Sequence, residues 1–247
     1  MISKKIILAL SLCVAGSMIS LQGAACTSGA TLATYEALST TGCEIDGLNF
    51  SGFVWTPTGA NPHSTPTDTQ VTLNTLLNGN GVGFLITPTV AFEAGGGGFA
   101  DGELKFIVKT VSTLNTITSL YQQIDGTVVA TGNFDDVSEN YCFGTLGIPG
   151  CTPIVNLESQ IGPTGCNVGS SDGAGGCKNS VSFAGVNAIS VRKDIRASAS
   201  AGGANADATI TGVINQFGPA VPEPGTYVLS FIGLALLFLG RRKVSQF

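Results

Sequence analysis

The feature that most constrains the fold is a series of short, apolar-rich runs separated by Gly, Asn, Asp and Pro. Residues 102–111 (GELKFIVKTV), for example, place Leu104, Phe106 and Val108 on one side and polar residues largely on the other. A period of two is typical of a half-buried strand, because successive side chains point to opposite faces of a sheet. Comparable runs occupy residues 50–55, 69–76, 81–87, 117–124, 126–134 (after an Asp-Gly turn), 181–183, 188–199 and 208–217.

Many short strands with turn residues between them predict an all-β fold, an antiparallel β-sandwich of jelly-roll type. The run at 32–38 has apolar residues three and four apart and predicts a short helix. Residues 186–200 suit either a long strand or an amphipathic helix. We expect 56–67 to be an exposed loop and 142–180 to be a disulfide-pinned loop region outside the sandwich. No stretch divides residues 26–220 into two domains.

The N-terminal residues 1–25 have the pattern of a secretory signal peptide. Lys4 and Lys5 precede the apolar run 6–21, and Gly23-Ala24-Ala25 supplies small residues for cleavage before Cys26. A lipoprotein signal is the alternative for a cysteine at this position, but it needs a large aliphatic residue where Gly23 stands. The sequence therefore predicts an exported protein.

The charge of the predicted domain excludes two classes of partner. The two ends carry five of the 11 Lys and Arg and one of the 16 Asp and Glu, so residues 26–220 hold 6 basic and 15 acidic side chains. Nucleic acid and anionic membrane surfaces both require a concentrated positive face. The largest basic cluster in the domain is only Arg192, Lys193 and Arg196.

Cysteine usage also favours export. One of the seven cysteines, Cys13, lies in the predicted signal peptide, and the even number that remains is typical of disulfides in an oxidising compartment. Six cysteines allow 15 pairings, of which pairing between sequence neighbours is the simplest. The disulfide candidates are Cys26 with Cys43, Cys142 with Cys151, and Cys166 with Cys177. Their spacing does not favour a metal site, and we expect no metal and no cofactor.

The C-terminal residues form a second processing segment. Val-Pro-Glu-Pro at 221–224 is followed by 15 uncharged residues, 226–240, and then by three cations. The prolines favour extended backbone around Glu223. The apolar run is short for a spanning helix of ~20 residues, but flanking residues extend it. The basic residues at both chain ends predict a precursor with both ends cytoplasmic and residues 26–220 outside. The stop-transfer residues are Arg241, Arg242 and Lys243.

This order of motif, apolar helix and basic end resembles the PEP-CTERM sorting signal of Gram-negative bacteria. The resemblance covers residues 221–243. It implies recognition and cleavage near the motif by an exosortase, an integral-membrane transpeptidase, in hosts that make exopolysaccharide and biofilm matrix. The sorting-motif residues by this resemblance are Val221, Pro222, Glu223 and Pro224.

No spacing of residues within 26–220 indicates a catalytic or metal-binding site. The single histidine, His63, lies among loop-forming residues. Residues 135–139 (DDVSE) could ligate Ca²⁺ through their oxygen atoms, but they lack the pattern of a calcium loop. We expect the acidic residues to be solvated and aromatic residues to be in the core, although Trp55, Tyr121 and Tyr141 could form a sugar platform. The prediction is a non-catalytic surface or matrix protein. A carbohydrate-binding module for exopolysaccharide is the first alternative, and a polysaccharide-processing enzyme the second. The acidic candidates for such an enzyme are Glu36, Glu93, Asp101, Glu103, Asp135, Asp136 and Glu139.

Overall fold

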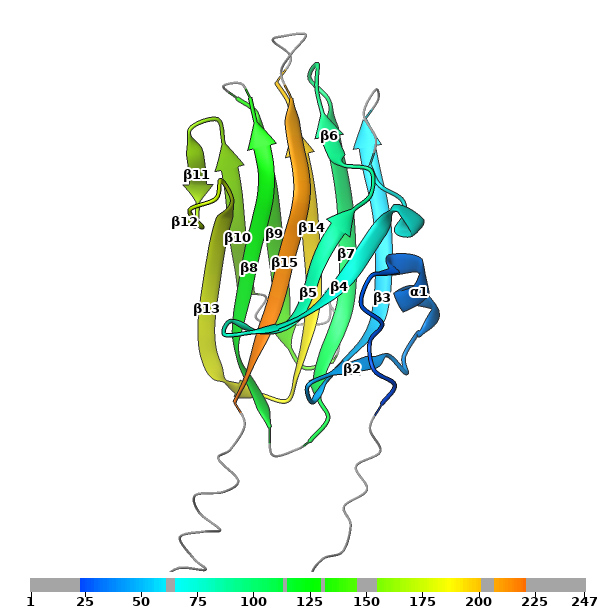
Figure 1. Ribbon diagram of the computed structural model, residues 1–247. Helices are drawn as coiled ribbons and strands as arrows, with labels where there is room; N and C mark the ends of the chain where they lie inside the picture. The colour runs from blue at the N-terminus through cyan, green and yellow to red at the C-terminus, as the bar shows by residue number, and fades with distance from the viewer. Residues whose placement is uncertain are drawn as a thin grey trace, which may run out of the picture.

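The computed structural model describes residues 23–60, 65–112, 115–129, 132–145, 155–200 and 207–220. In these residues two antiparallel sheets lie face to face and enclose one hydrophobic core, as Figure 1 shows. The chain crosses repeatedly from one sheet to the other, which is the connectivity of a jelly-roll-like sandwich. The predicted all-β sandwich is confirmed.

Each sheet combines pairs of consecutive strands with strands that are distant in sequence. The eight-stranded sheet has the order β1 (Ala30–Thr31), β4 (Val71–Asn78), β5 (Gly81–Pro88), β15 (Ala208–Ala220), β8 (Thr116–Val128), β13 (Cys177–Val186) and β12 (Ser170–Ser171), with β6 (Phe92–Ala94) also paired to β15. The seven-stranded sheet has the order β11 (Gly165–Val168), β10 (Val155–Gly162), β9 (Phe134–Phe143), β14 (Ala188–Ser198), β7 (Phe99–Thr110), β3 (Leu48–Ala60) and β2 (Cys43–Ile45). The helix α1 (Leu32–Ala37) and the 3-10 turn η1 (Asp68–Gln70) lie beside β3 and β4 (Figure 1).

The helix at α1 is confirmed, and most of residues 186–200 form strand β14 (Ala188–Ser198) instead of the alternative helix. The predicted Asp-Gly turn at 125–126 is wrong. Both residues lie inside β8, where Gly126 pairs with Ile210 and Asp125 with Gly212 of β15 across a bulge. A Cβ on Gly126 would lie 2.5 Å from Asp135 Oδ2 and from the Thr209 carbonyl. Glycine is therefore required here by close packing within a strand rather than by a turn.

Two expected loops contribute strands. β3 continues to Ala60, so the first part of the predicted loop 56–67 pairs with β7. Pro57 is tolerated because β2 covers only the start of β3, which leaves the rest of β3 at the edge of the sheet. Within residues 142–180, β10 pairs with β9 from Val155 to Ile161 and belongs to the seven-stranded sheet.

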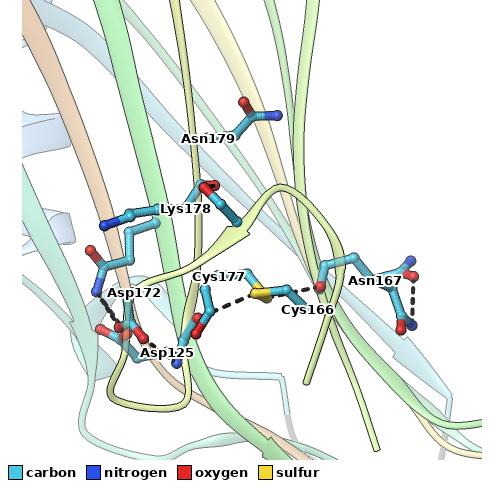
Figure 2. The surroundings of a disulfide bond; sticks show 12 residues. Asp125, Cys166, Asn167, Asp172, Cys177, Lys178 and Asn179 are labelled. Carbon is cyan, nitrogen blue, oxygen red and sulfur yellow. Dashed lines mark hydrogen bonds between the residues drawn. A yellow bond between two sulfur atoms is a disulfide. The ribbon is translucent and has the colours of Figure 1, made fainter. Parts of the chain in front are cut away.

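Two of the three simplest disulfide pairings are present. Cys26 is bonded to Cys43, and Cys166 to Cys177. The second bond links β11 to β13 and lies beside the loop that holds Asp172, as Figure 2 shows. Asp172 Oδ1 accepts hydrogen bonds of 2.8 Å from the amides of Ala174 and Gly176. Cys142 is also disulfide-bonded, while its predicted partner Cys151 lies outside the described residues.

Candidate functional site

The least expected feature of the sandwich is a polar cluster between the two sheets. In the seven-stranded sheet, Glu139 of β9 is directly opposite Lys193 of β14. In the eight-stranded sheet, Gln122 of β8 is directly opposite Asn215 of β15. Three of these side chains are 0% exposed and Asn215 is 1% exposed, so the two cross-strand pairs meet inside the core. We call these four residues the interior polar cluster.

Hydrogen bonds join the cluster across the space between the sheets. Lys193 Nζ donates to Glu139 Oε2 at 2.6 Å and to Gln122 Oε1 at 2.8 Å. Asn215 Nδ2 donates to the same Glu139 Oε2 at 2.9 Å. Gln122 Nε2 donates to the Val137 carbonyl at 2.8 Å, which fixes the orientation of its amide. One carboxylate oxygen therefore holds a lysine amine and an asparagine carboxamide side by side.

The surroundings of the cluster are apolar. The neighbouring inward positions on the four strands are all buried, and they are Val137, Tyr141, Val191, Ile195, Leu120, Ile124, Val213 and Phe217. Burial lowers the pKa of Lys193 below its ordinary value, and the charge of Glu139 opposes this only in part. Glu139 Oε1 and Asn215 Oδ1 have no hydrogen-bond partner among the described residues. Buried polar atoms without partners are rare in folded proteins, so the cluster needs an explanation other than stability.

Sequence reasoning missed this cluster. It grouped Lys193 with Arg192 and Arg196 as the largest basic cluster of the domain, and it expected the acidic residues to be solvated. The alternation of β14 contained the missing information, because Lys193 shares its face with Val191 and Ile195, whereas Arg192 and Arg196 point outward.

Asp135 is a second buried carboxyl group. Its side chain is 0% exposed, and burial raises its pKa to about 8, opposed only by the backbone of Thr209. Asp135 and Glu139 face the interior while Asp136 faces outward, so 135–139 cannot enclose one cation. Across the part of the chain that the structure covers, no three His, Cys, Asp or Glu side chains are placed to hold a metal.

The outward face of the seven-stranded sheet is charged. Glu103 of β7 forms an ion pair of 2.5 Å with Lys105 and a second ion pair with Arg192. Burial raises the pKa of Glu103, but the hydrogen bonds from these two cations outweigh it and hold the pKa below its usual value. Burial and a hydrogen bond to Asp101 raise the pKa of Asp194 to about 7.

This face continues along β9 and β10. Burial and the neighbouring charge of Glu158 raise the pKa of Asp136 to about 7. The guanidinium of Arg196 lies 5.0 Å from the ring centre of Phe99 and 5.9 Å from that of Phe134. Two carboxyl groups with raised pKa values and an arginine held between aromatic rings thus share one surface.

A shallow pocket of about 180 Å³ lies on the same face, between β3, β7 and β14. Its outward-facing lining combines the cations Lys105 and Arg192 with the apolar surface of Val54 and Ile107. The other lining residues are Gly52, Phe106, Ser190 and Val191. An apolar floor with cations at the rim suits a ligand that has both flat apolar surface and negative charge.

The other candidate residues from the sequence do not lie together in one site. Trp55 and Tyr141 are 7% and 1% exposed, so they are core residues and do not form a sugar platform. Glu36 accepts a hydrogen bond of 2.5 Å from the Trp55 amide, and Glu93 is exposed. His63, the sorting-motif residues 221–224 and the stop-transfer residues 241–243 lie outside the described residues. Among the helices that are described, none has the length and apolar character needed to cross a membrane.

Fold and cluster together define the class of this chain: a disulfide-bonded antiparallel β-sandwich protein with a polar cluster in its core. The family model for the PEP-CTERM protein-sorting motif matches residues 220–243. The chain therefore carries a PEP-CTERM sorting motif, which begins at the last residue of β15 and indicates an exported protein.

Comparison with other known proteins adds little. A search of curated proteins found no match. Among solved structures, a carbohydrate-binding module studied for specific mannan recognition, TmCBM27, is similar at 12% identity, with 76% of this chain and 94% of that chain covered and a TM-score of 0.29. A similarity at this level has no bearing on what this chain does.

Proposed function

We propose that this protein is an exported, non-catalytic component of the cell surface or extracellular matrix, sorted through its PEP-CTERM segment. In this proposal residues 1–25 direct export, residues 226–243 hold the precursor in the inner membrane, and an exosortase processes it near residues 221–224. The observation that carries the proposal is the match of the sorting motif to residues 220–243.

The position of β15 supports this order of events. β15 is an interior strand of its sheet, paired with β5 on one side and β8 on the other, and its pairing with β8 extends to Ala220. A cut after Ala220 would leave every one of these backbone hydrogen bonds in place. The beginning of the described chain and the end of β15 also lie toward the same end of the sandwich (Figure 1). A precursor held in the membrane by both termini fits this arrangement.

The test is substitution of the motif in a host that contains an exosortase. We expect Glu223→Ala, or deletion of 226–243, to lower the rate of processing at least tenfold in pulse-chase experiments. The matched control is Glu93→Ala, since Glu93 is an exposed glutamate outside the motif. Mass spectrometry of the mature protein reports the C-terminus. A mature protein that still ends at Phe247 would contradict the proposal.

A second candidate function, binding of acidic exopolysaccharide, is favoured by the pocket beside Lys105 and Arg192. Sugar rings present flat apolar faces, and uronic acids carry carboxylates that would compete with Glu103 for these two cations. We expect the exported protein to sediment with alginate or a similar polyuronate, and the double variant Lys105→Gln, Arg192→Gln to lose most of this binding. The control is Lys109→Gln, an exposed lysine on the same strand.

The same experiment separates the remaining alternatives. No sedimentation of the wild type would leave the structural role without a glycan ligand, whereas equal sedimentation of the wild type and the double variant would assign glycan binding to another surface. Shortening of the polysaccharide, lost on substitution of a single Asp or Glu of this face, would favour the enzyme.

A further inference from the structure

We propose that Lys193 and Asn215 become joined by an intramolecular amide bond, with Glu139 transferring the protons. Such a bond would connect β14 of the seven-stranded sheet to β15 of the eight-stranded sheet through the core. It is a covalent modification of the chain by its own side chains, and it needs no other reagent.

The first requirement is a neutral amine. An ammonium–carboxylate pair loses its hydration inside the core, and a proton shared along the 2.6 Å bond between Lys193 Nζ and Glu139 Oε2 allows both groups to become neutral. The lowered pKa of Lys193 agrees with this, because desolvation favours the uncharged amine. An unprotonated, desolvated lysine is the form that acts as a nucleophile.

The second requirement is an acceptor carbonyl next to that amine. The Asn215 carboxamide and the Lys193 amine share Glu139 Oε2, at 2.9 Å and 2.6 Å respectively. A half-turn of the Asn215 amide brings Oδ1, which lacks a partner among the described residues, to this position. The protonated Glu139 then donates to Oδ1 and polarises Cγ. Holding the reacting groups in a fixed arrangement replaces the concentration that a reaction in solution would need.

The step balances without an oxidant or a cofactor. The Nζ lone pair attacks Asn215 Cγ while Glu139 donates its proton to Oδ1, which gives a tetrahedral intermediate. Glu139 next removes a proton from Nζ and delivers it to Nδ2, in the manner of a general base followed by a general acid. The Cγ–Nδ2 bond breaks, ammonia leaves, the proton on Oδ1 returns to Glu139, and a neutral amide remains between Nζ and Cγ.

Gln122 acts as a positioning residue in this scheme. Its Oε1 accepts the second hydrogen bond of Lys193 Nζ at 2.8 Å, and its Nε2 is held by the Val137 carbonyl. A carbonyl oxygen that accepts from the amine in this way directs the nitrogen lone pair elsewhere. In the part of the chain that the structure describes, no hydrogen bond joins Glu139 to the Gln122 amide, so Asn215 is the acceptor that the proton-transfer group serves.

The bond has a consequence for the exported protein. β15 continues directly into the sorting motif at Ala220, so any tension on the membrane-held tail reaches the sandwich through this strand. A covalent link at Asn215 would pass that tension to β14 and hence to both sheets. The inference stands apart from the proposed function, because the reaction depends only on the folded core.

The test is peptide mass spectrometry of the full chain, expressed in an exporting host, purified, reduced and digested with trypsin. We expect loss of cleavage after Lys193, and residues 193–196 joined to the peptide that begins at Ala197, with a mass lower by one ammonia than the sum of the two. Complete cleavage after Lys193 would overturn the proposal. A link from Lys193 to Gln122 would overturn the assignment of Asn215.

Two variants test the part played by Glu139. In Glu139→Gln we expect the link to be lost, because an amide cannot carry the proton from Nζ to the leaving nitrogen. In the control Lys109→Arg, which removes an exposed lysine, we expect the link to remain complete. A link of undiminished yield in Glu139→Gln would overturn the role of Glu139. The wild-type digest decides whether the bond forms at all, so that result does not depend on how well a variant folds.

Discussion

The two parts of the core are built on opposite principles. Beneath α1, between β3, β5 and β7, the core is aromatic: Phe53 stacks on Phe106 with ring centres 5.5 Å apart, and Phe50 meets Phe84 edge-on at 4.9 Å. Between β8, β9, β14 and β15 the core contains the interior polar cluster instead. Both parts are equally buried, yet only the aromatic part is explained by apolar packing alone.

The difference teaches where function is to be sought in a sandwich that lacks an obvious cleft. Removing charges from water costs free energy that an apolar residue of the same size would not cost. A chain that needed only a stable core would have continued the aromatic packing across both sheets. The polar part therefore points to chemistry, whereas the aromatic part points to stability.

The aromatic part should show the largest loss of stability on truncation. We expect Phe50→Ala to lower the free energy of unfolding by about 4 kcal/mol, because it leaves a cavity beside Phe84 and Phe217. Denaturant unfolding of the mature protein measures this. The control Val54→Ala, on the exposed side of the same strand, should cost under about 1 kcal/mol. Equal losses for the two variants would contradict the packing described here.

The polar part should respond to the pairing of its groups and not only to their size. We expect Lys193→Met to lower the free energy of unfolding by about 3 kcal/mol, because it leaves the buried Glu139 without its hydrogen-bond partner and removes any covalent link. Adding Glu139→Gln to this variant should recover part of the loss, which a double-mutant cycle measures. Additive losses would show that the two groups do not interact.

The last prediction concerns the dependence of stability on pH, in which the two parts of the core should differ. Asp135 has a pKa of about 8 when folded and an ordinary value of 3.8. Between these values the folded chain keeps a proton that the unfolded chain has lost, so stability falls as pH rises through this window and is highest below it. We expect the free energy of unfolding to fall from pH 5 to pH 8 on account of this group.

Replacing the carboxyl group by a neutral amide tests this assignment. Asp135→Asn should weaken the dependence of stability on pH, while Asp136 and Asp194, whose pKa values are also raised, keep part of it. The exposed control Asp207→Asn should leave the dependence unchanged. Stability that rises from pH 5 to pH 8 in the wild type would contradict the assigned direction.

Much of the sandwich follows from local patterning. The alternation in 102–111 predicts β7, and the spacing in 32–38 predicts α1, because the two periods of two and near 3.6 are set by backbone geometry alone. The Asp-Gly dipeptide at 125–126 misleads because a turn and a close-packed strand both favour glycine. Which of the two applies depends on Asp135 of the next strand and on Thr209, which is remote in sequence.

The amino-acid sequence by itself determined the strand periodicity, the even set of cysteines and the C-terminal sorting motif, since each depends only on residue type and spacing along the chain. Tertiary structure alone decided that Glu139, Lys193, Gln122 and Asn215 meet. Their strands β8, β9, β14 and β15 belong to two different sheets. Strand order in a sandwich is set by long-range pairing that no local pattern records, and so is the chemistry that this pairing brings together.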